Sequence, residues 1–361
     1  MGMIVSKFGG SSLCDASHIK KVASILKSNP LRVVAVVSAP GKRSKEDTKI
    51  TDSLYTCARL VAQGNSCKDV FELVRNRYIT IAKDLNLSTS ITSALDEVYE
   101  NISNGAGSDY AASRGEYLNG VLISQYLGWN FIDAFDVVSI ESDGTVSEST
   151  YAKMRKAIID GEHYVLPGFF GKGVDGKVKT FSRGGSDISG AIVARSLEDC
   201  LYENWTDVSG ISKADPRIIS DAKVIDTLTY NEVRELAAVG FNVFHEEAIA
   251  PVREVGIPIQ VKNTNRPDDK GTSIVATRDS KIDPIVGISA KKEYYKISIH
   301  KLFLLKNPSR RAGIELQLLH AGFALEFILS GIDDLTYFAQ GPEVSQKTID
   351  DLIVSLTHTF K

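Results

Sequence analysis

The N-terminus of the chain joins a short apolar segment to a glycine pair, and this combination restricts the fold strongly. Met3–Val5 is typical of a strand, Lys7–Ser12 (KFGGSS) follows it directly, and residues 18–28 have a helix-like pattern. Because glycine has no Cβ, the backbone at Gly9 and Gly10 can approach a ligand closely. The N–H groups at the following helix start favour an anion, and the lysine that opens the segment adds positive charge. We predict a strand, a phosphate-binding turn and a helix, although ordinary turn chemistry would explain a glycine pair equally well.

Length and composition set the limits within which this prediction holds. The chain has 361 residues, enough for two or three domains, with 43% hydrophobic and 24% charged residues, as in ordinary globular proteins. A net charge of −3 argues against a nucleic-acid partner or an anionic membrane surface. The sequence contains no run long and apolar enough for a membrane helix and no signal-peptide core. Its four cysteines and six histidines are scattered, so we expect reduced thiols, no metal site and a cytoplasmic location.

Short strands alternate with helices over most of the chain. Strands are expected at 32–38, 131–134, 163–170, 201–207 and 257–262, and helices at 18–28, 50–101, 109–127 and 184–196. This alternation is typical of an α/β domain around an open, mostly parallel sheet with helices on both sides. We assign residues 1–283 to that domain.

The pattern changes near Asp283-Pro284. Residues 294–304, 324–330 and 335–340 are strand-like, while 311–322 and 343–359 are helical. The order β-α-β-β-α is that of a ferredoxin-like α+β unit without its last strand, which we place at 284–361. An open sheet edge needs a partner or a rearrangement to cover it. We therefore expect a homodimer or a higher homo-oligomer, or a shortened chain.

A second glycine pair, Gly184-Gly185, repeats the strand–turn–helix arrangement of the first. Two such turns at the carboxyl ends of parallel strands would face one crevice, where open α/β sheets bind ligands. Arg183 suits bidentate binding of a carboxylate. Asp187 could hold an amine or a metal, although an acid in a first helical turn also serves the helix dipole.

Further charged and hydroxyl side chains lie at strand ends or on helices. Glu116 belongs to a predicted helix, where a solvated face is the ordinary explanation of a charge. Thr206 and Asp207 end a strand and could bind a ribose or base, and Arg217, close to Asp215, could bind a phosphate. Turn chemistry explains these positions as well.

Taken together, the motifs resemble those of the aspartokinases, within the amino-acid kinase superfamily. The matching stretches are KFGGSS (7–12), VVSAPGK (36–42), SRGEYLNG (113–120), FSRGGSD (181–187), WTDVSGI (205–211) and ADPRI (214–218). They occur in the family's order, and the tail resembles the first of the family's two ACT units. The resemblance implies transfer of the ATP γ-phosphoryl group to the side-chain carboxylate of L-aspartate with Mg²⁺. That reaction is the first step of lysine, threonine and methionine biosynthesis.

The resemblance also implies roles for individual residues. Lys7 would bridge the transferring phosphoryl group, supported by Asp187. Arg183 would hold the α-carboxylate of aspartate, and Glu116 and Asp187 would face its α-ammonium. The other implied contacts are Ser38 and Thr51 near the substrate, and Gly9, Gly10, Ser11, Gly184, Gly185, Thr206, Asp207, Asp215 and Arg217 around the nucleotide and its phosphates. No protein metal ligand is assigned.

Two departures from the family pattern concern ATP binding. Ser212 stands near the place of a tyrosine, and Asn242 at the place of a lysine that contacts the nucleotide. We expect weaker ATP binding unless another residue, such as Lys213, substitutes.

Two alternatives to an aspartate kinase stay open. The chain could phosphorylate a different acid, such as acetylglutamate, which lacks the free amine that Glu116 would bind. It could also be a regulatory subunit that binds amino acids without catalysis. An amino-acid effector at the ACT-like unit is possible in either case, with weak or no feedback inhibition because the second unit is missing.

Overall fold

The computed structural model describes residues 2–87, 90–182, 184–238, 246–290, 293–306, 308–340 and 344–359. The chain divides into two compact units, Met1–Ser289 and Ala290–Lys361. This division falls a few residues after the boundary predicted at 283. The described residues form two hydrophobic cores in the first unit and one in the second.

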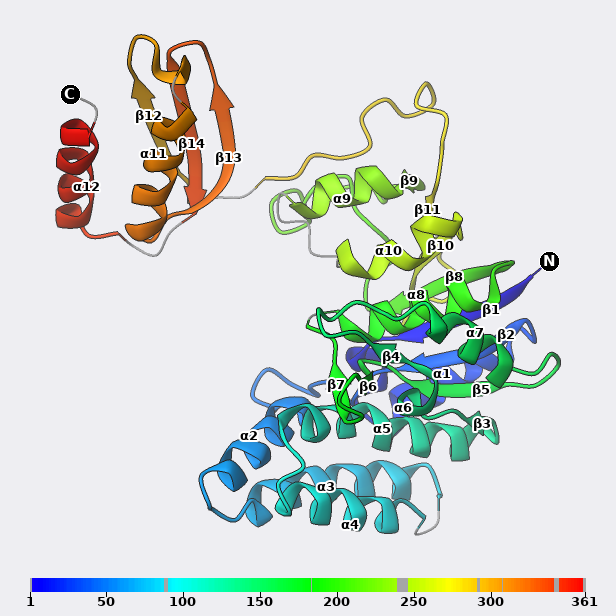
Figure 1. The fold of residues 1–361 in the computed structure, drawn as a ribbon. Coiled ribbons are helices and arrows are strands. Elements are labelled where there is room, and N and C mark those ends of the chain that lie inside the picture. The colour runs from blue at the N-terminus through cyan, green and yellow to red at the C-terminus, as the bar shows by residue number, and fades with distance from the viewer. Residues whose placement is uncertain are drawn as a thin grey trace. The chain divides into compact units, whose positions relative to one another are not determined.

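The larger unit is built on an eight-stranded sheet (Figure 1). In spatial order its strands are β3 (Asn130–Phe131), β5 (Tyr164–Pro167), β2 (Arg32–Val37), β1 (Met3–Phe8), β8 (Cys200–Thr206), β10 (Ile259–Asn263), β11 (Thr272–Val275) and β9 (Thr227–Thr229). All pairs from β3 to β10 are parallel, β10 and β11 are antiparallel, and β11 and β9 are parallel. The predicted open, mostly parallel sheet is confirmed.

Helices cover both faces of this sheet. They are α1 (Ala16–Lys27), α2 (Ile50–Ala62), α3 (Lys68–Asp84), α4 (Ser90–Ser103), α5 (Ser108–Leu127), α6 (Ala134–Val137), α7 (Ser149–Ala157), α8 (Gly185–Leu197), α9 (Tyr230–Ala238) and α10 (Glu246–Val255).

Among the described residues, no helix combines the length and apolar character needed to cross a membrane.

Strand β2 shows why the sheet must be covered twice. All six of its residues are buried. Val34 and Val36 belong to the core that includes residues of α8 and α10, while Ala35 and Val37 belong to the core that includes α1 and α5. Side chains alternate between the faces of a strand, so an uninterrupted apolar run needs helices on both sides. Figure 1 shows α8 and α5 on opposite sides of the sheet.

Several short elements were not predicted. They include a second sheet of β4 (Ser139–Ile140), β6 (Phe170–Gly173) and β7 (Val178–Thr180). These strands have two to four residues, which is too short for the alternation of side chains to be recognised. They matter for function because β6 and β7 precede the turn that carries the second glycine pair.

The smaller unit has a three-stranded antiparallel sheet in the order β12 (Tyr295–His300), β14 (Asp334–Gln340), β13 (Ala324–Ser330). Helices α11 (Pro308–His320) and α12 (Gln346–Thr359) complete the β-α-β-β-α order expected from the sequence. Ile314 and Leu318 of α11 pack with Leu335 and Tyr337 of β14 in its core. That this unit is of the ACT type stays a prediction.

Candidate active site

The carboxyl ends of β1, β2 and β8 meet at one edge of the sheet, because the three strands are parallel neighbours. A pocket of about 350 Å³ lies at the loops that follow β1 and β2 and at the start of α8. It is lined by Lys7, Gly9, Gly10, Ser38, Lys49, Thr51, Asp52, Glu116, Phe169, Gly184, Gly185, Ser186 and Asp187. The two glycine pairs therefore face one crevice, as the sequence predicted.

An ion pair joins the two halves of the pocket. Lys7 Nζ, near the end of β1, lies 2.5 Å from Asp187 Oδ1 in the first turn of α8, and the two side chains are 9% and 19% exposed. Asn204 of β8 donates a hydrogen bond from Nδ2 to the same Asp187 oxygen, over 3.0 Å. The lysine is thus held in place before any ligand enters, with its charge on the pocket wall.

The first glycine turn differs in detail from the prediction. Gly10 begins a 3₁₀-helix, Gly10–Leu13, and α1 starts only at Ala16, after Asp15. The Asp15 side chain already accepts a hydrogen bond from the backbone N–H of His18. We expected the N–H groups at the start of the helix to bind an anion. They are not those of α1, because the 3₁₀-helix lies between the glycine pair and α1.

Gly10 is required by a close approach between two loops. A Cβ at Gly10 would lie 2.9 Å from the carbonyl oxygen of Ala39, and one at Gly41 would lie 2.6 Å from the carbonyl of Gly10. The N–H of Gly41 donates to the Gly10 carbonyl over 2.8 Å. The glycines after β1 and β2 thus allow these loops to pack directly together, which places Ser38 beside the first turn.

The second turn needs glycine for two separate reasons. Gly184 has a φ of +60° at the N-cap of α8, a left-handed conformation that favours glycine. At Gly185 a Cβ would clash with the Phe169 ring at 2.4 Å. The N–H groups of the first helical turn have no intrahelical partner, so those at Gly185 and Ser186 can serve as anion donors at this pocket.

Glu116 contributes a buried carboxyl group to the lining of this pocket. It lies on α5, a helix that buries most of its length. Loss of hydration raises its pKa to about 8, although backbone hydrogen bonds at Ala39 and Glu116 and the charge of Arg114 act in the opposite direction. Its Oε2 atom has no hydrogen-bond partner among the described residues. A cation entering the pocket would supply the missing partner.

Arg114, two residues before Glu116, is enclosed by aromatic rings. Its guanidinium lies 4.5 Å from the ring centre of Tyr117, 4.6 Å from Tyr110 and 5.0 Å from Phe170. Burial lowers the pKa of this guanidinium. A solvated helix face was the ordinary explanation for Glu116; the helix is instead buried between the sheet and α2–α4, so that explanation is wrong.

Four lining residues were not predicted: Lys49, Asp52, Phe169 and Ser186. Lys49 could have been predicted from the sequence, because it ends a lysine-rich loop directly before the helix that carries Thr51. Phe169 could not have been predicted, because its place in the pocket depends on a positive φ of 81° that the sequence pattern does not reveal.

The remaining predicted residues lie elsewhere or cannot be placed. Ser11 is exposed and does not line the pocket. Arg183 and Asn242 lie outside the described residues. Lys213, considered as a substitute for the lysine missing at 242, forms an ion pair with Asp283 at 2.6 Å.

The nucleotide-binding candidates at the end of β8 and beyond it also lie outside the lining of this pocket. Thr206 donates to the carboxylate of Asp207 over 3.2 Å. Arg217 and Asp215 form a bidentate pair, with 2.7 Å between Nη2 and Oδ2. The Arg217 side chain is 87% exposed. Their contact with a nucleotide stays a prediction.

Comparisons with known proteins identify the family of the chain. Residues 2–263 match the amino acid kinase family. The chain is 37% identical to aspartokinase 3 of Bacillus subtilis (strain 168) over 364 aligned positions, which cover 96% of this chain and 80% of that protein. The crystal structure of Clostridium acetobutylicum aspartate kinase superposes with a TM-score of 0.93 at 42% identity, covering 99% of this chain and 82% of that one. Escherichia coli aspartokinase III, solved with lysine and aspartate, shares the fold with a TM-score of 0.79 at 21% identity, over 98% and 83% of the two chains.

Proposed function

The chain belongs to the amino acid kinase family, and on that premise we propose that it is an aspartate kinase. It transfers the γ-phosphoryl group of ATP to the side-chain carboxylate of L-aspartate, giving 4-phospho-L-aspartate and ADP. The observation that carries the proposal is the Lys7–Asp187 pair between two glycine turns, in one pocket with the buried Glu116. The likeness to aspartokinases over nearly the whole chain supports the choice of substrate.

The reaction brings two anions together, so the site must neutralise charge and align the reactants. Catalysis of this kind depends mainly on positioning and electrostatic stabilisation. Lys7 would contact the oxygens of the transferring phosphoryl group, and the N–H groups at the start of α8 would stabilise the charge developing on it. No general base is required, because the attacking carboxylate is ionised above its reference pKa of about 3.9.

The residues present also fit a Mg²⁺ ion accompanying the nucleotide. The pocket offers the carboxylates of Asp52 and Asp187, and carboxylate oxygens are ligands that Mg²⁺ prefers. When bound, the ion neutralises phosphate charge. Asp187 would additionally keep Lys7 directed into the pocket through their ion pair.

Substrate selectivity would come from the amine of the substrate. We assign the α-ammonium of L-aspartate to Glu116, whose Oε2 atom lacks a partner among the described residues. We assign its α-carboxylate to Arg183 from the sequence motif. An acetylated amino acid carries no ammonium group and would leave Glu116 unpaired.

The test is ADP release with Mg-ATP and L-aspartate, in the intact chain and in Lys7→Ala. We expect turnover that requires L-aspartate and falls at least about a hundredfold in the variant, as for loss of one stabilising donor. Lys156→Ala on α7, an exposed lysine, is the matched control and should leave turnover unchanged.

The alternative functions give different results in the same assay. Turnover with acetylglutamate in place of L-aspartate would indicate a kinase for another acid. Binding of aspartate or lysine without ADP release would indicate a regulatory subunit.

Two further properties belong to the proposal. An amino-acid effector would bind the smaller unit, and the chain would form homodimers or higher homo-oligomers. Lysine titration of the activity tests the effector, and light scattering of the purified chain tests the assembly.

A further inference from the structure

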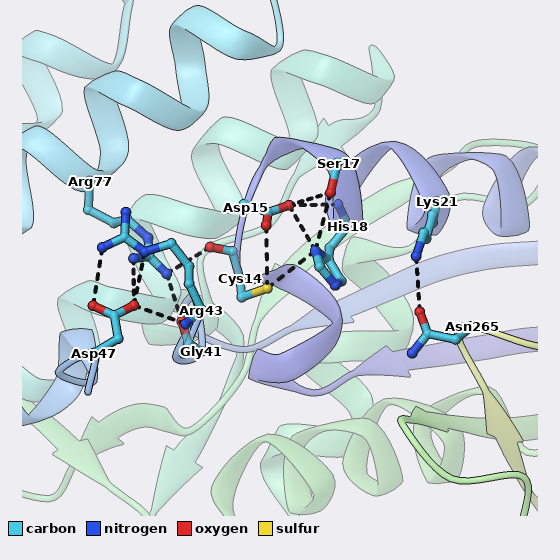
Figure 2. Close-up of polar contacts among 10 residues, drawn as sticks. All are labelled: Cys14, Asp15, Ser17, His18, Lys21, Gly41, Arg43, Asp47, Arg77 and Asn265. Atoms are coloured by element: carbon cyan, nitrogen blue, oxygen red, sulfur yellow. Dashed lines mark hydrogen bonds and ion pairs between the residues drawn. The ribbon is translucent and has the colours of Figure 1, made fainter. Parts of the chain in front are cut away.

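Three side chains that could bind a metal lie together just beyond the first glycine turn, outside the active-site pocket. Cys14 follows the 3₁₀-helix, Asp15 caps α1, and His18 lies in the first turn of α1 (Figure 2). The sequence predicted no metal site, because its cysteines and histidines are scattered along the chain. The fold brings the three ligand atoms within 4.8 Å of one another.

The three side chains lie close enough together to share one ion. The distances are 3.3 Å from Cys14 Sγ to His18 Nδ1, 2.8 Å from His18 Nδ1 to Asp15 Oδ1, and 3.8 Å from Cys14 Sγ to Asp15 Oδ2. Bond lengths of about 2.0–2.3 Å to zinc require neighbouring tetrahedral ligands about 3.3–3.6 Å apart. The Cys14–His18 contact already has this spacing, whereas the His18–Asp15 contact would lengthen by about half an ångström and one Asp15 oxygen would turn toward the ion.

Helix capping explains only part of this cluster. Asp15 Oδ1 accepts hydrogen bonds from the His18 backbone N–H at 2.9 Å and from Ser17 Oγ at 2.8 Å. Among the described residues, the other oxygen, Oδ2, has one long contact, from the Cys14 thiol. Capping requires neither a thiol nor an imidazole at these positions.

The charges around the cluster permit a divalent cation. A Cys14 thiolate and the Asp15 carboxylate supply two negative charges. Two positive charges oppose them. One is the partial charge of about +0.5 at the N-terminus of α1, and the other is the Arg77 guanidinium, which donates to the Cys14 carbonyl over 2.8 Å. Arg77 and Arg43 are both paired with Asp47, at 2.9 and 3.0 Å. The negative ligands outweigh the opposing charge.

We propose that Cys14, Asp15 and His18 bind a thiophilic divalent cation of the zinc type, with a fourth position open to solvent. Sulfur, imidazole and carboxylate are the ligands zinc takes in proteins, and three of them with one open position is a known pattern. Mg²⁺ avoids such a set, so this site is chemically separate from that of the nucleotide's ion. Its metal would tie the end of the 3₁₀-helix to α1, directly behind the phosphate-binding turn.

The test uses Co²⁺ as a spectroscopic probe on the intact, nucleotide-free chain. We expect one Co²⁺ per chain, with the ultraviolet charge-transfer absorption of a cobalt–thiolate bond, and displacement by Zn²⁺. His18 is partly exposed, and His18→Ala should weaken Co²⁺ binding at least about tenfold. Loss of a residue that only orients a metal ligand already costs that much, so loss of a ligand should cost no less. Cys14→Ser should abolish the absorption.

Two controls separate this site from other ligands of the chain. Cys200→Ser removes a buried thiol that donates to a backbone carbonyl, and it should keep the absorption. Asp187→Asn alters the active-site pocket and should keep it as well. The absence of a thiolate band in the intact chain, its persistence in Cys14→Ser, or its loss in either control would overturn the proposal.

Discussion

Glu116 links the chemistry of a single residue to a measurable pH dependence. Its pKa is raised to about 8 because the carboxyl is buried, so the free enzyme holds it largely protonated at neutral pH. Only the carboxylate can pair with the α-ammonium of the substrate. Below pH 8, binding of aspartate must therefore release a proton from Glu116, and the affinity for aspartate rises with pH.

We accordingly predict that the KM for L-aspartate falls as the pH is raised from 6 to 7.5. Well below the pKa, the change approaches about tenfold per pH unit, since one proton is released for each substrate bound. Glu116→Gln cannot ionise and should show a high KM without this dependence. Steady-state kinetics across the range provide the measurement; a KM that is flat in the intact enzyme would contradict the assigned role.

Arg77 connects helix α3 to the end of the 3₁₀-helix and to the loop that follows β2 (Figure 2). From α3 its guanidinium donates to the carbonyl of Cys14, after the 3₁₀-helix, and to the carbonyl of Gly41, both over 2.8 Å. Gly41 in turn donates to the Gly10 carbonyl. The side chain thus supports the phosphate-binding turn from behind, and it positions rather than contacts the substrate.

We predict that Arg77→Met lowers the free energy of unfolding by about 3 kcal/mol, because it breaks the buried pair with Asp47, which keeps only Arg43, and leaves the carbonyls of Cys14 and Gly41 without their Arg77 donor. The KM for ATP should also rise, since the turn loses its support. Denaturant unfolding and steady-state kinetics measure the two effects. Arg75→Met on the same helix is the control: its partners are Glu72 and Asp96, which are 44% and 57% exposed, so the loss should stay under about 1 kcal/mol. Equal losses in both variants would refute the positioning role.

Sequence alone predicted the elements whose pattern is long and regular. The parallel strands β1, β2 and β8 and the helix α5 were expected because their apolar residues follow strand or helix spacing over several residues. The pocket could be anticipated for the same reason: parallel strands end at one edge, so the segments after β1 and before α8 had to meet.

What the sequence could not reveal depends on contacts between distant residues. Glu203 stands within strand β8 and accepts hydrogen bonds from Ser6, Arg32 and Trp205 inside the sheet. No local pattern indicates such a network. The burial of Glu116 was missed likewise, because it results from the packing of α5 against neighbouring helices rather than from the composition of α5.

At the scale of the whole molecule, the pocket and both of its supporting cores belong to the first compact unit. Every described lining residue and every member of those two cores lies within Met1–Ser289. The second unit has a separate core of its own.

We predict that a chain ending at Ser289 folds and binds Mg-ATP as tightly as the intact chain, because no pocket residue is removed. Isothermal titration with a non-hydrolysable ATP analogue measures this. Lys7→Ala in the same shortened chain should bind more weakly, which shows that the signal comes from the pocket. A soluble but non-binding fragment would show that the second unit completes the site.

The central claim is that this pocket phosphorylates the side-chain carboxylate of L-aspartate. Trapping with hydroxylamine tests it most directly, because hydroxylamine converts an acyl phosphate into a hydroxamate and releases phosphate. With Mg-ATP and L-aspartate we predict aspartyl hydroxamate in amounts equal to the ADP formed, and a large loss of both in Asp187→Asn. ADP release without hydroxamate would mean that the phosphoryl group goes to water or to another acceptor, and it would contradict the account.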